Sequence, residues 1–172
     1  MKCSIVDIHT HRPTGKALEP SFAGIHPWQA ETRRIEEIVP RFGEVDLVGE
    51  IGLDYAGTVG REAQLRIFRE QLDWAERLGK PVVLHCVKAF EAVMRELAPH
   101  ALRAVIFHGF IGSSQQAAEA IKKGYYLSFG ERTFRSPRTV EEIYRRIAQA
   151  KDLDPELLKC AIYRNYREIF ER

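Results

Sequence analysis

The sequence has few cysteines, no long apolar run and no strong excess of charge of either sign. Its three cysteines, Cys3, Cys86 and Cys160, are widely separated and form no Cys-x-x-Cys pair. This spacing argues against a disulfide scaffold and against a cysteine-based zinc site, and it suits a reducing cytoplasm. Because no apolar stretch is long enough to span a bilayer, we expect a cytoplasmic protein that has no membrane partner.

The charge balance leaves the class of partner open. The chain of 172 residues has a net charge of +2 and a pI near 8.5, which neither requires nor excludes a nucleic-acid or phosphate partner. Its residues are 45% hydrophobic and 29% charged, which is the composition of a globular protein with a sizeable core. We therefore expect a single domain that spans residues 1–172.

Short apolar segments alternate with stretches of helical spacing along the chain. Strands are predicted over residues 3–8, 22–25, 45–51, 81–84, 103–107 and 125–129, and one of the helices is predicted over 30–39, ending at Pro40. This alternation predicts βα units and a parallel sheet. No glycine-rich phosphate loop occurs, so a TIM-type (β/α) barrel fits better than a doubly wound sheet. Since a full barrel takes about 250 residues, we expect an incomplete or open α/β barrel of about six strands.

Residue types that bind metal ions follow the predicted strands. His9 and His11 alternate along the first strand and therefore point to the same side, while Glu50, His85 and His108 end later strands. Together these five residues could hold two divalent ions, Zn²⁺, Mg²⁺ or Mn²⁺, about 3.5 to 4 Å apart, with Glu50 between them. For any one of them alone a structural role is at least as common, so the prediction rests on their joint placement. Such a pair of ions suits hydrolysis.

Other residues near the strand ends are candidates for substrate binding. His26, Asp54, Arg12 and Lys88 could contact a substrate at the mouth of the barrel. His26 could instead be a structural histidine, Asp54 could be an ordinary turn former, and Arg12 and Lys88 could belong to a solvated rim. Three further arginines also follow a strand end, namely Arg132, Arg135 and Arg138.

These motifs resemble those of the TatD-related metal-dependent DNases, a family of amidohydrolase-like TIM barrels. The matching stretches occur in family order and include Asp-Ile-His-Thr-His at 7–11, Gly-Ile-His-Pro at 24–27, Gly-Glu-Ile-Gly-Leu-Asp at 49–54, residues 64–85, His-Gly-Phe-Ile-Gly at 108–112 and the closing helix at 165–170. The resemblance implies that His9 and His11 bind one metal ion, that His85 and His108 bind the other, and that Glu50 bridges them.

The chain departs from the family pattern in two places. Only fourteen residues separate His11 from His26, so one βα unit is expected to be missing. The family also has a late strand whose Asp completes the first metal site, whereas this chain has no Asp between Asp73 and Asp152. We consider Glu131 a poor substitute for that residue. Missing strands would leave the first and sixth predicted strands as edges, so a homodimer formed through exposed strand edges is one expectation.

The leading hypothesis is a metal-dependent hydrolase that resembles TatD deoxyribonucleases. It would cleave phosphodiester bonds of DNA, or of a small phosphoester, by metal-activated water, with Glu50 as the central catalytic residue. Three alternatives stay open. The same residues would suit an amidohydrolase that acts on a C–N or ester bond, the missing Asp would suit a catalytically silent metal-binding relative, and a scaffold would bind no metal at all.

Overall fold

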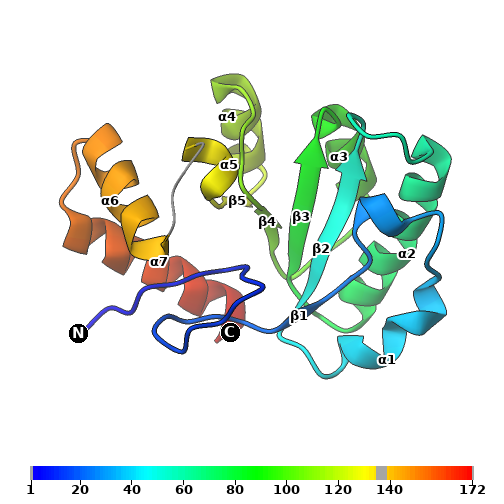
Figure 1. The fold of residues 1–172 in the computed structure, drawn as a ribbon, viewed down its shortest axis with the longest axis horizontal. Coiled ribbons are helices and arrows are strands. Elements are labelled where there is room, and N and C mark those ends of the chain that lie inside the picture. The colour runs from blue at the N-terminus through cyan, green and yellow to red at the C-terminus, as the bar shows by residue number, and fades with distance from the viewer. Residues whose placement is uncertain (1, 135–138, 172) are drawn as a thin grey trace.

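A parallel sheet forms the centre of the computed structural model, which describes residues 2–134 and 139–171. Its five strands lie in chain order: β1 (Phe22–Ala23), β2 (Leu47–Asp54), β3 (Val82–Val87), β4 (Val105–Phe107) and β5 (Tyr126–Leu127). All neighbouring pairs are parallel. A doubly wound sheet reverses its strand order at a switch point, whereas a (β/α) barrel does not. The fold is therefore an incomplete α/β barrel, as expected (Figure 1).

Two amphipathic helices cover one face of the sheet. In α2 (Arg61–Arg77) the buried apolar residues recur at helical spacing, and in α3 (Phe90–Leu97) they occupy one side. The main core joins both helices to the sheet through the fully buried side chains of Phe68, Leu72, Val93, Val48 and Leu84. Figure 1 shows α2 on the side of the sheet opposite the C-terminal helices.

The last two helices, α6 (Val140–Ala150) and α7 (Pro155–Phe170), lie on the side of the other face (Figure 1). Of the two helices before them, α4 (Ser114–Lys122) adds its buried Ala120 to the main core, and α5 (Glu131–Phe134) follows β5. A second, smaller core packs Ile169, near the end of α7, against Leu47, Val83 and Ile106 of three strands. The end of α7 thus fills space on the face that further strands of a closed barrel would enclose.

The first predicted strand does not form, and the sheet has five strands instead of six. Residues 3–8 make only an isolated parallel bridge between Val6 and Leu18. On its other side, the backbone N–H of Val6 donates to the hydroxyl of Tyr144 in α6 (3.0 Å), and that hydroxyl donates to the Val6 carbonyl (3.1 Å). A side chain therefore satisfies the backbone groups that a neighbouring strand would otherwise pair.

The helix predicted over residues 30–39 is also wrong. The chain instead forms two 3₁₀ turns, η1 (Pro27–Gln29) and η2 (Ile35–Glu37), followed by the short helix α1 (Val39–Phe42). Pro40 lies in the first turn of α1, where the missing N–H has no intrahelical partner to lose. It therefore helps to start a helix here and does not end one.

A disulfide joins the two ends of the chain, in contrast to the expected reduced cysteines. Cys3 in the N-terminal segment is bonded to Cys160 in α7, across 157 residues of sequence, and Cys86 is a free thiol. Burial raises the pKa of the Cys86 thiol to about 12. No helix in the described part of the chain is long and apolar enough to cross a membrane.

Candidate metal centre

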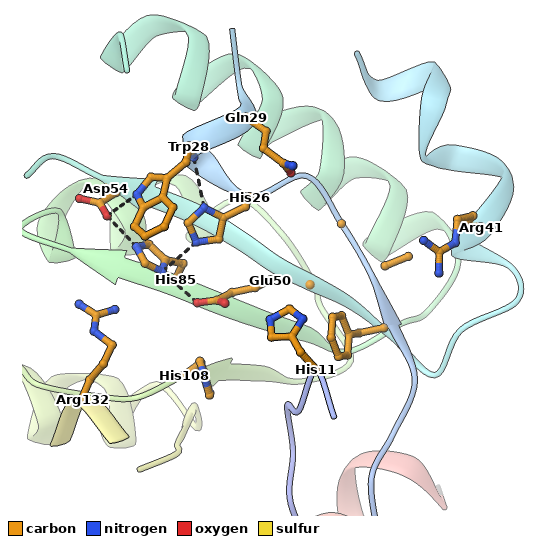
Figure 2. A pocket seen from close by; sticks show the side chains of 14 residues that line it. His11, His26, Trp28, Gln29, Arg41, Glu50, Asp54, His85, His108 and Arg132 are labelled. Carbon is orange, nitrogen blue, oxygen red and sulfur yellow. Dashed lines mark hydrogen bonds and ion pairs between the residues drawn. The ribbon is translucent and has the colours of Figure 1, made fainter. Parts of the chain in front are cut away.

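A cleft of about 700 Å³ opens where the strands end. Residues from several strand ends and connecting segments line it, among them His11, His26, Trp28, Arg41, Glu50, Asp54, His85, His108 and Arg132 (Figure 2). Strand ends of a barrel converge in this way, which brings residues far apart in sequence into one cavity.

Glu50 reaches the cleft from an irregularity in β2. The register between β2 and β3 shifts between Val48 and Ile51, and such a shift re-aims the side chains beside it. Gly52 follows with φ of +136°, and a Cβ there would lie 2.1 Å from the carbonyl oxygen of His85. Only glycine allows β2 and β3 to approach this closely, and their approach places Glu50 beside His85.

The first group of candidate ligands is Glu50, His85 and His26. The Nδ1 atom of His85 lies 2.9 Å from Oε1 of Glu50 and 3.1 Å from Nε2 of His26. The other ring nitrogen of His85, Nε2, lies 2.8 Å from Oδ2 of Asp54, which also accepts the indole N–H of Trp28 at 2.8 Å. A histidine that donates one N–H to a carboxylate presents its other nitrogen as a ligand, which is the usual arrangement around bound zinc.

Hydrogen bonding determines the tautomer of His26. The backbone N–H of Trp28 donates to Nδ1 of His26 (3.2 Å), so the proton of the neutral His26 ring resides on Nε2. Nδ1 of His85 lies 3.1 Å from that Nε2 and 2.9 Å from Oε1 of Glu50. An imidazole nitrogen and a carboxylate oxygen this close together could bind one divalent ion, so the donor set fits a metal ion.

The second group of candidate ligands is His9, Glu50 and His108. One potential ligand atom from each lies within 4.8 Å of the others, as is also the case in the first group. His9 is only 7% exposed, and within the described ranges neither of its ring nitrogens has a hydrogen-bond partner, although Nε2 lies 3.3 Å from Oε2 of Glu50. Buried imidazole nitrogens are rarely left without partners. A metal ion would satisfy one of them.

The protonation states suit metal binding. Burial by itself would raise the pKa of Glu50, but the adjacent His85, His9 and His108 outweigh it and hold that pKa well below its usual range. Burial, reinforced by the nearby His9, lowers the pKa of His108 to about 4. Burial and the nearby His85 lower that of His26 to about 4. At neutral pH the carboxylate is therefore charged and both of these rings are neutral, as ligands must be.

Two buried glutamines of α2 hold the segments that carry the site. Gln71 accepts from the backbone N–H of Ile25 (2.6 Å) and donates to its carbonyl (3.1 Å), immediately before His26. Gln64 makes the same pair of bonds with the backbone of Asp54, at 2.7 and 2.9 Å. Neither glutamine was predicted from the sequence to support the site. Their signal is the seven-residue spacing, which places two amides on one otherwise apolar face of a helix.

The remaining predicted residues take different positions. His11 lines the cleft, and its ring centre lies 4.9 Å from that of His9, but it belongs to neither ligand group. Arg132 lines the cleft, whereas the exposed Arg12 and Lys88 are not among its described lining residues. Arg135, Arg138 and the side chain of Glu131 lie outside the described parts of the chain.

The two groups differ from the pairs that the resemblance implied. Glu50 is shared by both, as expected for a bridging ligand. His9 is grouped with His108, however, while His85 is grouped with His26, which we had considered a substrate contact. Ser128, which directly follows β5 and was not predicted from the sequence, approaches Nδ1 of His108 (3.2 Å) and so fixes the orientation of that ring.

Comparison with known proteins adds independent information. The family model described as TatD related DNase matches residues 16–136. A putative deoxyribonuclease TATDN1 homolog of Encephalitozoon cuniculi is 30% identical over 151 residues, which are 85% of this chain and 54% of that protein. The 3'-5' ssDNA/RNA exonuclease TatD of Enterobacter lignolyticus is 33% identical over 62% of this chain and 44% of its own length. The chain thus spans about half the length of these curated relatives.

Solved structures share the fold. The TatD homolog YJJV of Escherichia coli has a TM-score of 0.75 at 21% identity, and the match covers 90% of this chain and 77% of that one. A TatD family hydrolase of Entamoeba histolytica has a TM-score of 0.73 at 14% identity, over 90% of this chain and 75% of that one.

Proposed function

Because the chain belongs to the TatD related DNase family, we propose that it is a metal-dependent hydrolase that cleaves phosphodiester bonds of nucleic acid. The observation that carries this proposal is the position of Glu50, whose carboxylate lies between two groups of histidines in an open cleft. A carboxylate shared by two imidazole groups is the donor set of a two-ion hydrolytic centre.

The two ions would share Glu50 and would otherwise have different ligands on this chain. His9, Glu50 and His108 would hold one divalent ion, and Glu50 with His85 would hold the second. When bound, such ions lower the pKa of water and stabilise charge on phosphate oxygens. Asp54 orients His85 for this role, and Ser128 orients His108. Zn²⁺, Mg²⁺ and Mn²⁺ are the ions to test.

His26 has a different role from the ligands in this proposal. Because its Nδ1 accepts the Trp28 amide, its Nε2–H is a donor that faces the ligand groups. A phosphate oxygen entering the cleft would accept this hydrogen bond in place of His85. Arg41 and Arg132 would attract the neighbouring phosphates, since Figure 2 shows them on opposite sides of Glu50.

The relatives suggest the substrate class. Those named above are called a putative deoxyribonuclease and an ssDNA/RNA exonuclease, whereas another, YabD of Bacillus subtilis, is called only an uncharacterized metal-dependent hydrolase. A polynucleotide therefore comes first among the substrates to test. A small phosphoester and an ester or amide belong in the same substrate panel.

Hydrolysis of end-labelled single-stranded DNA by metal-free protein tests the proposal. Activity is expected after addition of Mg²⁺, Mn²⁺ or Zn²⁺, and Glu50→Gln should lower it at least a hundredfold because both ions lose a charged ligand. Glu119→Gln, a change of an exposed carboxylate on α4, is the matched control and should leave the rate unchanged. No hydrolysis with any of the three ions would overturn the assigned activity.

A catalytically silent metal-binding protein is the second candidate. It is favoured by one observation: among the described residues, the His9 group contains a single carboxylate and no aspartate. In that case metal analysis of the purified protein would find bound ions, while wild type and Glu50→Gln would show equally negligible turnover. The two measurements together separate the candidates.

The remaining expectations concern the state of the protein. We propose that residues 1–172 act as one domain and that the protein is cytoplasmic. The redox state of the Cys3–Cys160 pair in cell extracts tests the location, because a reduced pair is expected in the cytoplasm and an oxidised pair is not. A homodimer would pair the strand edges at β1 and β5, each of which has one neighbouring strand among the residues that the structure describes. Sedimentation equilibrium would distinguish a dimer from a monomer.

A further inference from the structure

Trp28 is a large apolar side chain that the fold leaves open to solvent. The residue is 63% exposed, although it lies in η1 beside the buried Pro27 and lines the cleft. Aromatic residues of this size normally bury most of their surface in a core or an interface. A tryptophan with a purely structural role would therefore be covered, and this one is not.

The exposed ring is nevertheless held in one position. Its indole N–H donates to Oδ2 of Asp54 at 2.8 Å, and its backbone N–H donates to Nδ1 of His26 at 3.2 Å. The ring meets His26 at a centroid distance of 4.6 Å and an interplanar angle of 69°, and it meets His85 at 5.8 Å and 71°. These contacts fix its orientation, so a ligand that stacks on it would not have to order it first.

The surroundings indicate what would stack there. Trp28 stands beside the group of Glu50, His85 and His26, where the proposed function places a phosphate, and Arg132 lies on the other side of His85 (Figure 2). A ligand that spans these positions carries a phosphate and a flat aromatic group joined by a short linker. A nucleotide unit of a polynucleotide has this composition.

We propose that Trp28 forms a nucleobase subsite, on which one unpaired base stacks while its phosphate lies at the candidate metal centre. The inference rests on the proposed function. Every base offers a π-face, so the subsite would be tolerant of sequence. In a duplex both faces of an internal base are covered by its neighbours, so the subsite selects single strands and frayed ends.

Binding of labelled decathymidylate tests the subsite. The comparison ligand is an oligomer of equal length in which abasic tetrahydrofuran units replace the nucleotides. Both oligomers are titrated at low salt, once in the presence of a chelator and once with Ca²⁺. Wild type should bind decathymidylate about tenfold more tightly than the abasic oligomer. Trp28→Leu should abolish that preference, and Trp28→Phe, which keeps an aromatic face but loses the bond to Asp54, should keep most of it.

Fluorescence gives a second readout. The chain has two tryptophans, so the variant Trp74→Phe leaves Trp28 as the only one, and its emission can be excited selectively over that of the six tyrosines. Decathymidylate should quench its emission, and the abasic oligomer should not. Equal binding of the two oligomers by wild type would overturn the subsite and leave phosphate binding intact. An equal loss of preference in Trp28→Phe and Trp28→Leu would also overturn it, because the ring would then act only through Asp54. Absence of binding to either oligomer would overturn the proposed function together with the subsite.

Discussion

The hydroxyl of Tyr144 takes the place of a neighbouring strand for Val6, and Tyr144→Phe tests how much the His9 segment depends on it. The hydroxyl accepts from Val6 N–H at 3.0 Å and donates to Val6 C=O at 3.1 Å. Val6 and Tyr144 are 7% and 8% exposed. Burial raises the pKa of Tyr144 to about 12, so the hydroxyl stays protonated and keeps both roles at any ordinary pH.

The loss of stability expected for Tyr144→Phe follows from the backbone groups that lose a hydrogen-bond partner. Phenylalanine keeps the ring and removes the oxygen, which leaves one buried N–H and one buried C=O unsatisfied. Each such group costs about 1–3 kcal/mol, and water entering the loosened segment would recover part of that cost. We expect the free energy of unfolding to fall by about 2–3 kcal/mol, or Tm to fall by about 4–12 °C for a domain of this size.

Urea denaturation of the metal-free, disulfide-bonded protein measures this loss, and calorimetric Zn²⁺ titration measures its effect on the site. Since His9 follows Val6 by three residues, Tyr144→Phe should weaken Zn²⁺ binding by the His9 group about tenfold. His108→Asn, which removes a ligand of that group, identifies this binding event in the titration. Tyr126→Phe is the matched control, because its hydroxyl donates to the exposed carboxylate of Glu168 at 3.3 Å. Its cost should stay within about 0.5 kcal/mol. Equal losses of stability in the two tyrosine variants would contradict this role of the Tyr144 hydroxyl, as would unchanged metal binding in Tyr144→Phe.

Two further predictions concern stability. Gln71→Leu leaves the backbone N–H and C=O of Ile25 without the partners that Gln71 supplies. It should therefore lower the free energy of unfolding, measured in urea, by about 2–4 kcal/mol. The control Gln149→Leu, at an exposed position, should change that free energy by less than about 0.5 kcal/mol. The metal-free protein should also lose stability as the pH falls from about 6.5 to about 4.5. His26 and His108 have folded-state pKa values of about 4, so the unfolded chain takes up their protons first. Urea midpoints across this range should fall, and less steeply in His108→Asn; a flat profile would contradict the assignment of buried neutral rings.

The sheet and the position of the site could be predicted because both follow from local patterns. Continuous apolar runs identify β3 and β4 as strands covered on both faces, and parallel strands must place their carboxyl ends at one edge. His85 and Glu50 were predicted to meet for that reason alone, and their atoms lie 2.9 Å apart. Glycines on both sides of Glu50 added a correct indication of close backbone approach, which Gly52 shows most directly.

The contacts that sequence reasoning missed are those between a side chain and a distant backbone. Gln64, Gln71 and Tyr144 each bond both the N–H and the C=O of one residue, 10, 46 and 138 positions away. The spacing of the two glutamines on an apolar helix face indicates that they are buried, but no periodic pattern shows which distant backbone groups a side chain will bond. The Cys3–Cys160 bond is unpredictable for the same reason, because pairing across 157 residues depends on where α7 lies in the fold.

These two kinds of contact divide the candidate site. Glu50, Asp54 and His85 lie on β2 and β3. These strands pair from Val48 with Val82 to Asp54 with Val87, so backbone hydrogen bonds between the strands hold this half of the site. His9 lies in a segment with one bridge residue, which the Tyr144 hydroxyl and the Cys3–Cys160 bond fasten to the helices α6 and α7. That pair of helices does for His9 what strand pairing does for His85. Metal binding by the His9 group would therefore depend on contacts with α6 and α7, whereas binding by the His85 group would depend on strand pairing and on the glutamines of α2.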